Sequence, residues 1–483
     1  MKKTTKLLCG LFATGFLAAG LAGCATVSNV KNEDNELIYN GTSAVLVNDS
    51  YLYFGNSYAD YSAFEEDGDY KSSAELSYLA RLEAGANIIA DGIDYSPEKV
   101  EQVAEEVVSH QKSFMFVLGD YIYYLTPNRK KFENSDGKLE QQYSYSTLYR
   151  SKLNGNSKKE LYTTEAEIST IEVLKYQNKY YIVLLAGNDL IKFKLGDKVR
   201  RTVIADDAVT VAIPQTYEKN RVGSTLDWNG NIYYTQSKTN EDNADVSGTS
   251  IRKVSIAGGD NVEVGGGMGQ TVSLIGREKD IIFYTYNGET YKVDANQNSQ
   301  IVVGSNANLF SSSEVSNIYE VYEQEAEQVL GYIYTSNSGL RYKTNSGRTG
   351  ALTLNYDETA LSDYNVLLVS GRVLYFSTTN AIYSADLSSA FNGNGGTIDC
   401  KAIVKLDDDS VYSGSLYAFD GQYIYYYAKL QTLEAEEGSE EEVEQSTDEN
   451  YYLYRTRVGN NADSSPKTPY ELLSLVDDKD RRS

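Results

Sequence analysis

The chain has 483 residues, 41% of them hydrophobic, with 43 Tyr against 13 Phe and one Trp. This aromatic bias, together with turn-forming residues spread along the chain, favours an all-β fold of many short strands. The 68 acidic and 44 basic side chains give a formal net charge of −24, and no dense basic patch stands out. Such a surface repels nucleic acid and anionic lipid headgroups, which argues against both as direct partners of the folded part.

The first 23 residues predict a signal peptide. Three lysines within the first six residues precede an apolar run over 7–22 that is too short and too Gly-broken for an ordinary membrane span. The run ends in Leu21-Ala22-Gly23-Cys24, which resembles the lipobox of bacterial lipoproteins. The resemblance implies cleavage after Gly23 and lipidation of the Cys24 thiol, with 24–36 as lipidated cysteine and tether. The alternative is an ordinary signal peptide with an incidental cysteine.

A motif with paired aromatic residues returns along the chain. The stretch GDYIYYL at 119–125 is followed by GNIYYT at 230–235 and GQYIYYY at 421–427. A spacing near fifty residues indicates a propeller or a solenoid. The eight occurrences are Leu52-Tyr53-Phe54, Ile122-Tyr123-Tyr124, Tyr180-Tyr181-Ile182, Ile232-Tyr233-Tyr234, Ile282-Phe283-Tyr284, Ile333-Tyr334-Thr335, Leu374-Tyr375-Phe376 and Ile424-Tyr425-Tyr426.

The surroundings of the motif favour the propeller. Turn residues precede it, and a second strand such as LYRSKLNG at 148–155 follows it, which makes three or four hairpin-linked strands per repeat. Ile and the second Tyr of IYY point to one face and the first Tyr to the other, as a strand covered on both faces requires. We therefore predict a β-propeller of four-stranded antiparallel blades over 37–483. Eight blades are expected, or seven if a terminal unit only completes another blade, with 36–41 and 470–478 sharing the closing blade.

Two segments depart from the repeat. Residues 96–111, SPEKVEQVAEEVVSHQ, begin with Ser-Pro and carry Glu in the first turn, which predicts a helix or an exposed excursion. Just before it, LSYLARLEAG at 76–85 fits either a hairpin strand or a helix. Residues 433–449 contain nine acidic side chains and no basic one and predict a disordered loop in the last blade, with cation binding or a basic partner as the functional alternative.

The sequence offers little catalytic chemistry. His110 is the only histidine and has no nucleophile motif beside it, so no catalytic residue is assigned. Cys400 is the lone cysteine of the folded part and is expected to be a small buried hydrophobe, so neither a disulfide nor a usual metal site is predicted. Asp294, Asn296 and Asn298 alternate as in a calcium loop, but Gly and the final acid are missing, so a hairpin turn explains them better. No cofactor is predicted.

With the lipobox and these repeats, the chain resembles uncharacterised Tyr-rich propeller lipoproteins of Gram-positive-type bacteria. Their repeats are distantly similar to those of the low-density lipoprotein receptor propeller, although the Tyr-Trp-Thr-Asp signature is absent here. The resemblance implies an extracytoplasmic protein held on the outer face of the cell membrane by its N-terminal lipid, and it transfers no site residue except Cys24. We expect a non-catalytic propeller that binds or scaffolds a protein, peptide or glycan at one face. The alternative is a glycan-cleaving enzyme with two or three carboxylates in the central funnel.

Overall fold

The computed structural model describes most of the chain between residues 37 and 472. The described residues are 37–38, 45–47, 51–56, 63–66, 69–72, 78–83, 101–104, 114–127, 131–133, 139–141, 145–196, 198–212, 216–218, 221–223, 230–239, 247–268, 272–278, 281–286, 289–294, 315–323, 328–379, 381–393, 395–405, 411–419, 423–429, 452–458 and 471–472.

The first half of the described chain forms three large sheets and three small pairs. In hydrogen-bonding order they are β1 (Leu37–Ile38), β8 (Met115–Leu118), β9 (Tyr121–Pro127), β12 (Tyr145–Lys152), β13 (Lys159–Tyr176), β14 (Lys179–Ala186), β15 (Asp189–Lys194) and β16 (Arg200–Ala205) in one sheet; β2 (Val45–Val47), β3 (Tyr51–Asn56), β6 (Tyr78–Glu83) and β7 (Glu101–Ala104); β17 (Ala208–Ala212), β20 (Asn231–Thr239), β21 (Ser247–Ser255) and β22 (Val262–Met268); and the pairs β4 (Ala63–Glu66) with β5 (Asp69–Ser72), β10 (Lys131–Glu133) with β11 (Leu139–Gln141), and β18 (Thr216–Glu218) with β19 (Arg221–Gly223).

The second half forms four sheets and a short helix. They are β23 (Val272–Glu278), β24 (Ile281–Tyr286) and β25 (Glu289–Asp294); β26 (Val315–Glu323), β27 (Gln328–Ser336), β28 (Gly339–Thr344) and β29 (Thr349–Ala351); β31 (Thr359–Ala360), β30 (Thr353–Tyr356), β35 (Thr397–Lys405), β34 (Ala381–Asp386), β33 (Val373–Ser377) and β32 (Asn365–Ser370); and β36 (Val411–Phe419), β37 (Tyr423–Lys429), β38 (Tyr452–Arg457) and β39 (Glu471–Leu472), with helix α1 (Ser388–Asn392) between β34 and β35.

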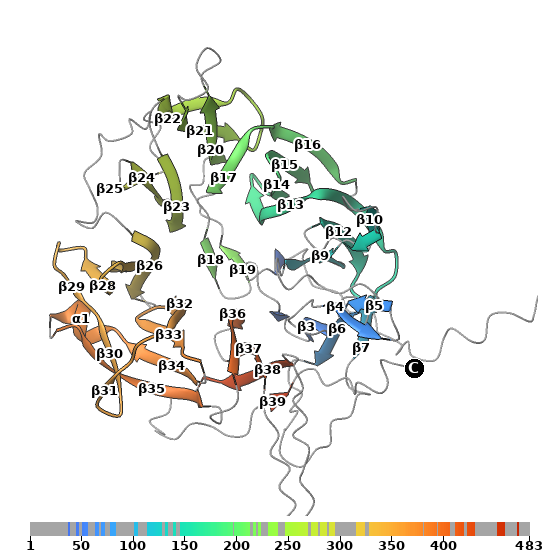
Figure 1. The fold of residues 1–483 in the computed structure, drawn as a ribbon. Coiled ribbons are helices and arrows are strands. Elements are labelled where there is room, and N and C mark those ends of the chain that lie inside the picture. The colour runs from blue at the N-terminus through green and yellow to red at the C-terminus, as the bar shows by residue number, and fades with distance from the viewer. Residues whose placement is uncertain are drawn as a thin grey trace, which may run out of the picture.

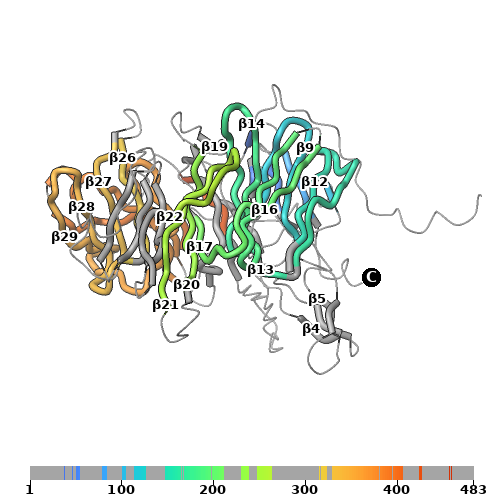
Figure 2. Tube along the Cα trace, turned by 90° about the horizontal axis from the view of Figure 1, so that it is seen from above, coloured from blue at the N-terminus to red at the C-terminus, as the bar shows by residue number. Residues whose placement is uncertain are grey.

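The larger sheets lie around a ring in chain order, and Figure 1 shows the ring along its axis with the pair β18–β19 inside it. Figure 2 shows it from the side, with strands such as β14 and β21 crossing its thickness. Neighbouring strands are antiparallel throughout the described sheets, apart from the parallel pairing of β30 with β35. The predicted all-β propeller with antiparallel blades is therefore confirmed.

Each unit is named here by the strand that carries its aromatic motif. The β9 repeat contains β8, β9, β12 and β13 up to Glu167, and the β14 repeat contains β13 from Ile168 with β14–β16. The other units used below are the β3 repeat (β2, β3, β6, β7), the β20 repeat (β17, β20–β22), the β27 repeat (β26–β29) and the β33 repeat (β32–β35).

The aromatic motifs face two neighbours at once. In β9, Ile122 and Tyr124 belong to the hydrophobic cluster shared with the β3 repeat, whereas Tyr123 and Leu125 belong to the cluster shared with the β14 repeat. All four side chains are at most 2% exposed. A buried Tyr ring takes about 150–250 Å² out of water, so these rings contribute much of the attraction between repeats. The expected use of the motif tyrosines in packing is confirmed here.

The motif of the β27 repeat was predicted at Ile333-Tyr334-Thr335, one residue too far along the chain. Ile333 lies in the cluster shared with Leu374 and Phe376 of the next repeat, which is the orientation that Tyr123 has in β9. The middle residue of the motif is therefore Ile333, not Tyr334. Because Ile and Tyr both fit either face of a doubly covered strand, the letters alone do not fix the phase, and a shift of one residue exchanges the faces.

The prediction of eight separate four-stranded blades is not supported. Among the described residues, six sheets contain four or more strands, and the β24 sheet contains three. The difference arises partly at β13, an 18-residue strand that pairs with β12 up to Glu167 and with β14 from Ile168 onward. Two repeats that the sequence separates therefore share one eight-stranded sheet.

Two further expectations were wrong. The N-terminal strand β1 pairs with β8, and β39 pairs with β38, so the two ends do not share a sheet. Leu37 and Ile38 side chains join the clusters on opposite faces of the β9 repeat, which explains why β1 extends that edge. Of residues 96–111, for which a helix or an exposed excursion was predicted, 101–104 form β7, whose Val103 and Ala104 are buried, and the rest lie outside the described residues. Residues 78–83 form strand β6, the first of the two readings given for 76–85.

Candidate functional site

Most residues singled out by the sequence cannot be placed. Gly23, Cys24, His110 and the acidic stretch 433–449 lie outside the described residues. Asp294 ends β25, and Asn296 and Asn298 also lie outside. In the described part of the chain, no group of three or more His, Cys, Asp or Glu side chains could hold a metal ion. No helix there is long and apolar enough to cross a membrane.

Cys400 is placed, and its environment is that of a structural thiol. It lies on β35 beside β30 in the same sheet, and its Sγ donates a 3.6 Å hydrogen bond to the carbonyl of Ile398. Burial raises the pKa of the thiol to about 12, although a backbone hydrogen bond at Asn355 opposes the shift. Because the thiolate is the reactive form, a thiol held neutral in this way is a poor nucleophile. The expectation of a small buried hydrophobe is confirmed.

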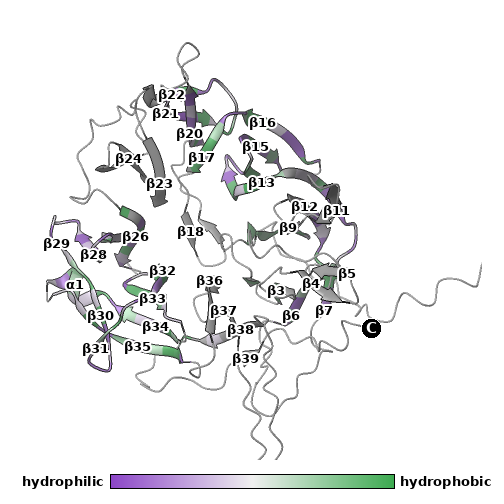
Figure 3. Ribbon diagram, viewed as in Figure 1, coloured by the Kyte–Doolittle hydropathy of each residue, from purple (hydrophilic) through white to green (hydrophobic). Residues whose placement is uncertain are grey.

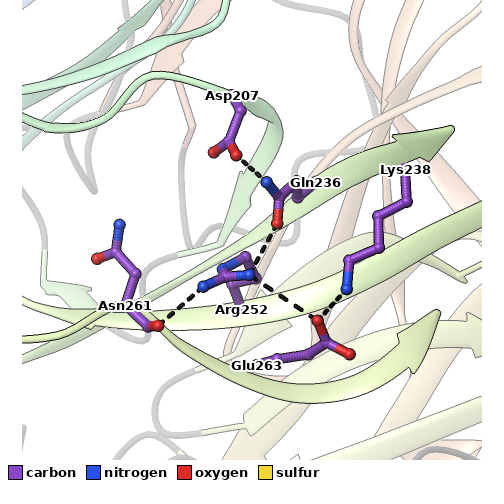
Figure 4. A network of polar contacts seen from close by, with 6 residues as sticks. All are labelled: Asp207, Gln236, Lys238, Arg252, Asn261 and Glu263. Atoms are coloured by element: carbon purple, nitrogen blue, oxygen red, sulfur yellow. Dashed lines mark hydrogen bonds and ion pairs between the residues drawn. The ribbon is translucent and has the colours of Figure 1, made fainter. Parts of the chain in front are cut away.

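A polar network on the β20 repeat is the first candidate site (Figure 4). Arg252 donates from its guanidinium to the side-chain oxygen of Gln236 at 2.9 Å and to the carbonyl of Asn261 at 2.8 Å. Gln236 in turn donates to Asp207, and Glu263 pairs closely with Lys238. Strand register explains the assembly, because Arg252 lies opposite Tyr234 and next to Glu263 on one face of the sheet.

The network extends a hydrophobic interface to its polar rim. Tyr234 belongs to the cluster shared with the β14 repeat, and burial raises the pKa of its hydroxyl while nearby Arg252 opposes the shift. Alternate residues of β20 lie on the same face, so Gln236 and Lys238 continue outward from Tyr234. Asn261 then donates at 3.1 Å to the carbonyl of Ile204, which belongs to the β14 repeat. The cluster therefore ties two repeats together.

The contacts of this network are structural, because both carboxylates already have partners within it. Asp207 accepts from Gln236, and Glu263 is engaged by Lys238 and, at 3.8 Å, by Arg252. A glycan-cleaving pair would instead leave two carboxylates facing an open site about 5–10 Å apart. Exposed ion pairs contribute about 0–1 kcal/mol each, so the apolar cluster beneath the network carries more of the stability.

A second charged cluster lies in the β3 repeat and joins a buried arginine to a carboxylate that is 28% exposed. Arg81 is 0% exposed, and its guanidinium reaches Glu101 on β7 at 2.8 and 2.9 Å. The same guanidinium lies 4.0 Å from the centre of the Tyr51 ring. An arginine without water requires such partners, because an uncompensated buried charge is costly. This cluster also stabilises the fold and presents no open catalytic group among the described residues.

Sequence reasoning missed both clusters because strand register assembles them. Arg81 and Glu101 are 20 residues apart, and Asn261 meets Ile204 across 57 residues. The available signal was local: Gln236 and Lys238 break the alternation of apolar residues that Ile232 and Tyr234 begin. Polar residues at the end of an otherwise buried strand indicate the rim of the sheet.

Comparison with known proteins gives the fold no functional context. No protein-family model matches the chain, and no curated protein matches it. Among solved structures, AztD from Citrobacter koseri is 12% identical, covers 88% of this chain and 95% of its own, and has a TM-score of 0.40. The β-propeller domain of the Trilobed protease from Pyrococcus furiosus is 7% identical, with 72% and 94% covered and a TM-score of 0.35.

A third solved structure is an uncharacterized protein, lmo1340, from Listeria monocytogenes EGD-e. It is 8% identical, covers 64% of this chain and 85% of its own, and has a TM-score of 0.32. At these values the similarities carry no inference about activity or ligand.

Proposed function

We propose that the chain is a lipid-anchored, extracytoplasmic propeller that binds or scaffolds a protein, peptide or glycan without catalysing a reaction. The observation that carries the proposal is the use of the motif aromatics, which are buried between repeats and contribute to packing. Side chains available to a ligand then come from the turns at the two faces of the ring. Propellers commonly present binding loops in that way.

The proposed anchor rests on the leader and on the spacing to the fold. Cys24, the last residue of the lipobox-like Leu21-Ala22-Gly23-Cys24, begins the proposed tether 24–36. The first described strand begins at Leu37. Thirteen residues can span at most about 45 Å when extended, so the propeller would stay close to the membrane. Two or three acyl chains on Cys24 would hold it there stably.

Anchoring is tested by labelling producing cells with an alkyne-bearing fatty acid. Cys24→Ser should abolish incorporation into the chain and release the protein from membranes, whereas the matched control Cys9→Ser should keep the label. Incorporation that survives Cys24→Ser would overturn the anchor, and so would a wild-type chain without label.

Binding is tested with the purified lipoprotein in detergent, exposed to solubilised envelope proteins and to surface glycans. A partner retained at a stoichiometric ratio is the expected outcome. New reducing ends in the glycan fraction would overturn the non-catalytic proposal and direct attention to carboxylates in the central funnel.

A further inference from the structure

Positive charge is concentrated in one part of this acidic chain. Residues 150–201 contain eleven Lys and Arg against six Asp and Glu, a net charge of +5, so the remaining residues carry −24 − 5 = −29. The segment 192–201 alone holds five cations and one acid. The cations are spread over several strands and turns, so no compact basic motif is visible in the sequence. An asymmetry of this size indicates an electrostatic docking surface.

Strand register collects the cations of the β14 repeat at one end. Lys179 pairs with Tyr176 beside the turn that joins β13 to β14. At the same end Lys194 pairs with Tyr181 and with Arg200, and Lys198 lies in the turn between β15 and β16. The backbone N–H of Leu195 donates at 2.9 Å to the carbonyl of Tyr180, which fixes the second turn against the start of β14.

The β9 repeat has the same arrangement. Lys152 pairs with Tyr121 at the start of β9, and Arg150 pairs with Lys159 at the start of β13. The N–H of Leu153 donates at 3.1 Å to the carbonyl of Asp120, which corresponds to the bond from Leu195 in the next repeat. Neighbouring repeats of a propeller are related by rotation about its axis, so equivalent turns lie on the same face of the ring.

The resulting surface, called the basic face, has eight cations over two repeats. The two repeats are neighbours in the ring of Figure 1. The same turns and strand ends carry only three acids by sequence, Asp120, Glu160 and Asp197. The hydrophilic start of β16 is visible in Figure 3. The members of the basic face are Lys152, Lys158, Lys159, Lys175, Lys179, Lys194, Lys198 and Arg200. All of them except Lys152 and Lys175 are exposed.

Tyrosines accompany these cations. The Lys158 ammonium lies 5.5 Å from the centre of the Tyr149 ring, and the Lys175 ammonium lies 5.6 Å from that of Tyr180. Both tyrosines are half-buried. A tyrosine side chain combines an apolar body with a polar tip. Lysine beside tyrosine is the composition that proteins place at the headgroup level of a membrane.

The first described strand begins at this face. β1 is antiparallel to β8, and its first residue, Leu37, pairs with Leu118. Leu118 immediately precedes the turn at 119–120, which belongs to the basic face. The first described residue, Leu37, therefore lies at the end of the sheet that carries the cations. Under the proposed lipid anchor, acyl chains and cations would act on the same surface.

We propose that the basic face docks on an anionic phospholipid surface and orients the propeller with its opposite face outward. The proposal rests partly on the proposed lipid anchor, which supplies the direction of approach. Lipid and basic residues together are the two signals that hold a peripheral protein stably, and they are additive because one is hydrophobic and the other electrostatic.

The experiment uses the full chain bound to vesicles of phosphatidylcholine, with or without about 30% phosphatidylglycerol, in low and high salt. Two variants remove two cations each, Lys158→Gln with Lys159→Gln, and Lys198→Gln with Arg200→Gln. The matched control is Lys401→Gln with Lys405→Gln on β35, where Lys405 pairs with Ala381 at the end away from the basic face. All six side chains are exposed, so unchanged thermal unfolding is expected and is checked first.

We expect each basic-face pair to lower the affinity gained from phosphatidylglycerol about 10- to 30-fold, and salt to remove the difference. The control pair should leave that gain nearly unchanged. Equal losses in all three variants, or no gain from phosphatidylglycerol in the wild type, would overturn the proposal. Binding to soluble polyphosphate but not to vesicles would also overturn it and assign the face to an anionic polymer.

Failure of the anchor and failure of the basic face can be told apart. Cys24→Ser removes the attachment point for lipid but none of the eight cations. A phosphatidylglycerol-dependent gain that persists in Cys24→Ser supports the basic face even where fatty-acid labelling is negative. A labelled wild type without that gain keeps the anchor and rejects the docking surface.

Discussion

Two arginines connect neighbouring strands in different repeats of the propeller, and they differ in how much water reaches them. Arg81 in the β3 repeat is 0% exposed and is enclosed by Glu101 and Tyr51. Arg252 in the β20 repeat has a 22% exposed side chain and bonds to Gln236 and to the Asn261 carbonyl, with Glu263 at 3.8 Å. Both arginines connect neighbouring strands, but only the second keeps contact with solvent.

The difference shows how strongly solvent exposure determines the contribution of an ion pair to the stability of the fold. A carboxylate beside an exposed cation contributes about 0–1 kcal/mol, because water already stabilises both charges. Removing the carboxylate from a buried arginine costs about 3–5 kcal/mol, because the charge is left with too little compensation. The same pair of residue types therefore stabilises the β20 repeat weakly and is required in the β3 repeat.

The largest effect is expected from Glu101→Gln. The substitution removes the negative charge that lies 2.8 Å from Arg81, and the free energy of unfolding should fall by about 3 kcal/mol. Urea denaturation measures the change. The matched control is Glu83→Gln, an exposed carboxylate on the same strand as Arg81, which should shift stability by less than about 0.5 kcal/mol. Equal shifts in the two variants would show that burial of Arg81 does not depend on Glu101.

Replacing the pair together sharpens the test. Arg81→Met combined with Glu101→Met should be less destabilising than Glu101→Gln alone, since no buried charge remains. If the double variant is less stable than Glu101→Gln, the loss of stability comes from lost packing against Tyr51 and not from an unpaired charge.

Arg252→Gln should have a smaller effect, about 1–2 kcal/mol, because the lost hydrogen bonds lie at a half-solvated rim. The loss should shrink in high salt for the part that comes from Glu263, whereas the Glu101→Gln loss should change little. Thermal unfolding at two salt concentrations measures both. A salt-independent loss at Arg252 would mean that its bonds to Gln236 and to the Asn261 carbonyl dominate.

The sequence predicted the ring because its packing signal is repeated and local. The aromatic motif of Ile122, Tyr123 and Tyr124 fills two interfaces by simple alternation, so its recurrence indicates stacked sheets. A second signal was available and unused: an apolar residue after the third strand, such as Leu153, Leu195 or Ile256, is buried and bonds back to the first turn. Its recurrence marks the same face in each repeat.

Blade boundaries and chain closure were beyond the sequence for a physical reason. A strand long enough to leave one sheet and join the next, as β13 does at 167–168, has no distinct composition at the transition. The edge that β1 joins depends on which strand offers open hydrogen-bonding groups, and that is a property of the assembled ring. The basic face was missed for the same reason, because register collects cations such as Lys159, Lys179 and Lys198 from separate strands and turns.

Arg348→Ala should cost about 0.5–1 kcal/mol. The Arg348 guanidinium donates to the carbonyls of Ala390 and Phe391 at 3.2 and 2.8 Å and so satisfies the C-terminal end of α1. Water can replace the exposed bond to Phe391 more readily than the partly buried bond to Ala390. Lys401→Ala on neighbouring β35 removes the same charge without a bond to α1 and serves as control. Hydrogen exchange at 388–393 should quicken only in Arg348→Ala.

The smallest effect at neutral pH is expected at Cys400. Unlike the two arginines, this side chain is buried but uncharged. Its pKa of about 12 lies above the ordinary 9.0, so the folded protein holds the proton more tightly than the unfolded chain. The stability difference is therefore constant below pH 9 and decreases as pH rises from 9 toward 12. Cys400→Ala should lose less stability than wild type over that interval, and urea denaturation from pH 7 to 11 measures it. Buried tyrosines shift in the same direction, but they are common to both proteins and cancel in the comparison.

Thiol labelling tests the same burial without relying on stability. With Cys9→Ser and Cys24→Ser in place, Cys400 is the lone thiol of the chain. At pH 8 it should resist an aromatic disulfide reagent in the folded protein and react at once in urea, because the thiolate is scarce and the side chain is buried. Leu354→Ala, which opens a cavity under β30 at a residue that is 1% exposed, should restore measurable reaction. Fast labelling of the folded parent would show that β30 detaches readily from β35, and that neutrality at Cys400 does not come from burial.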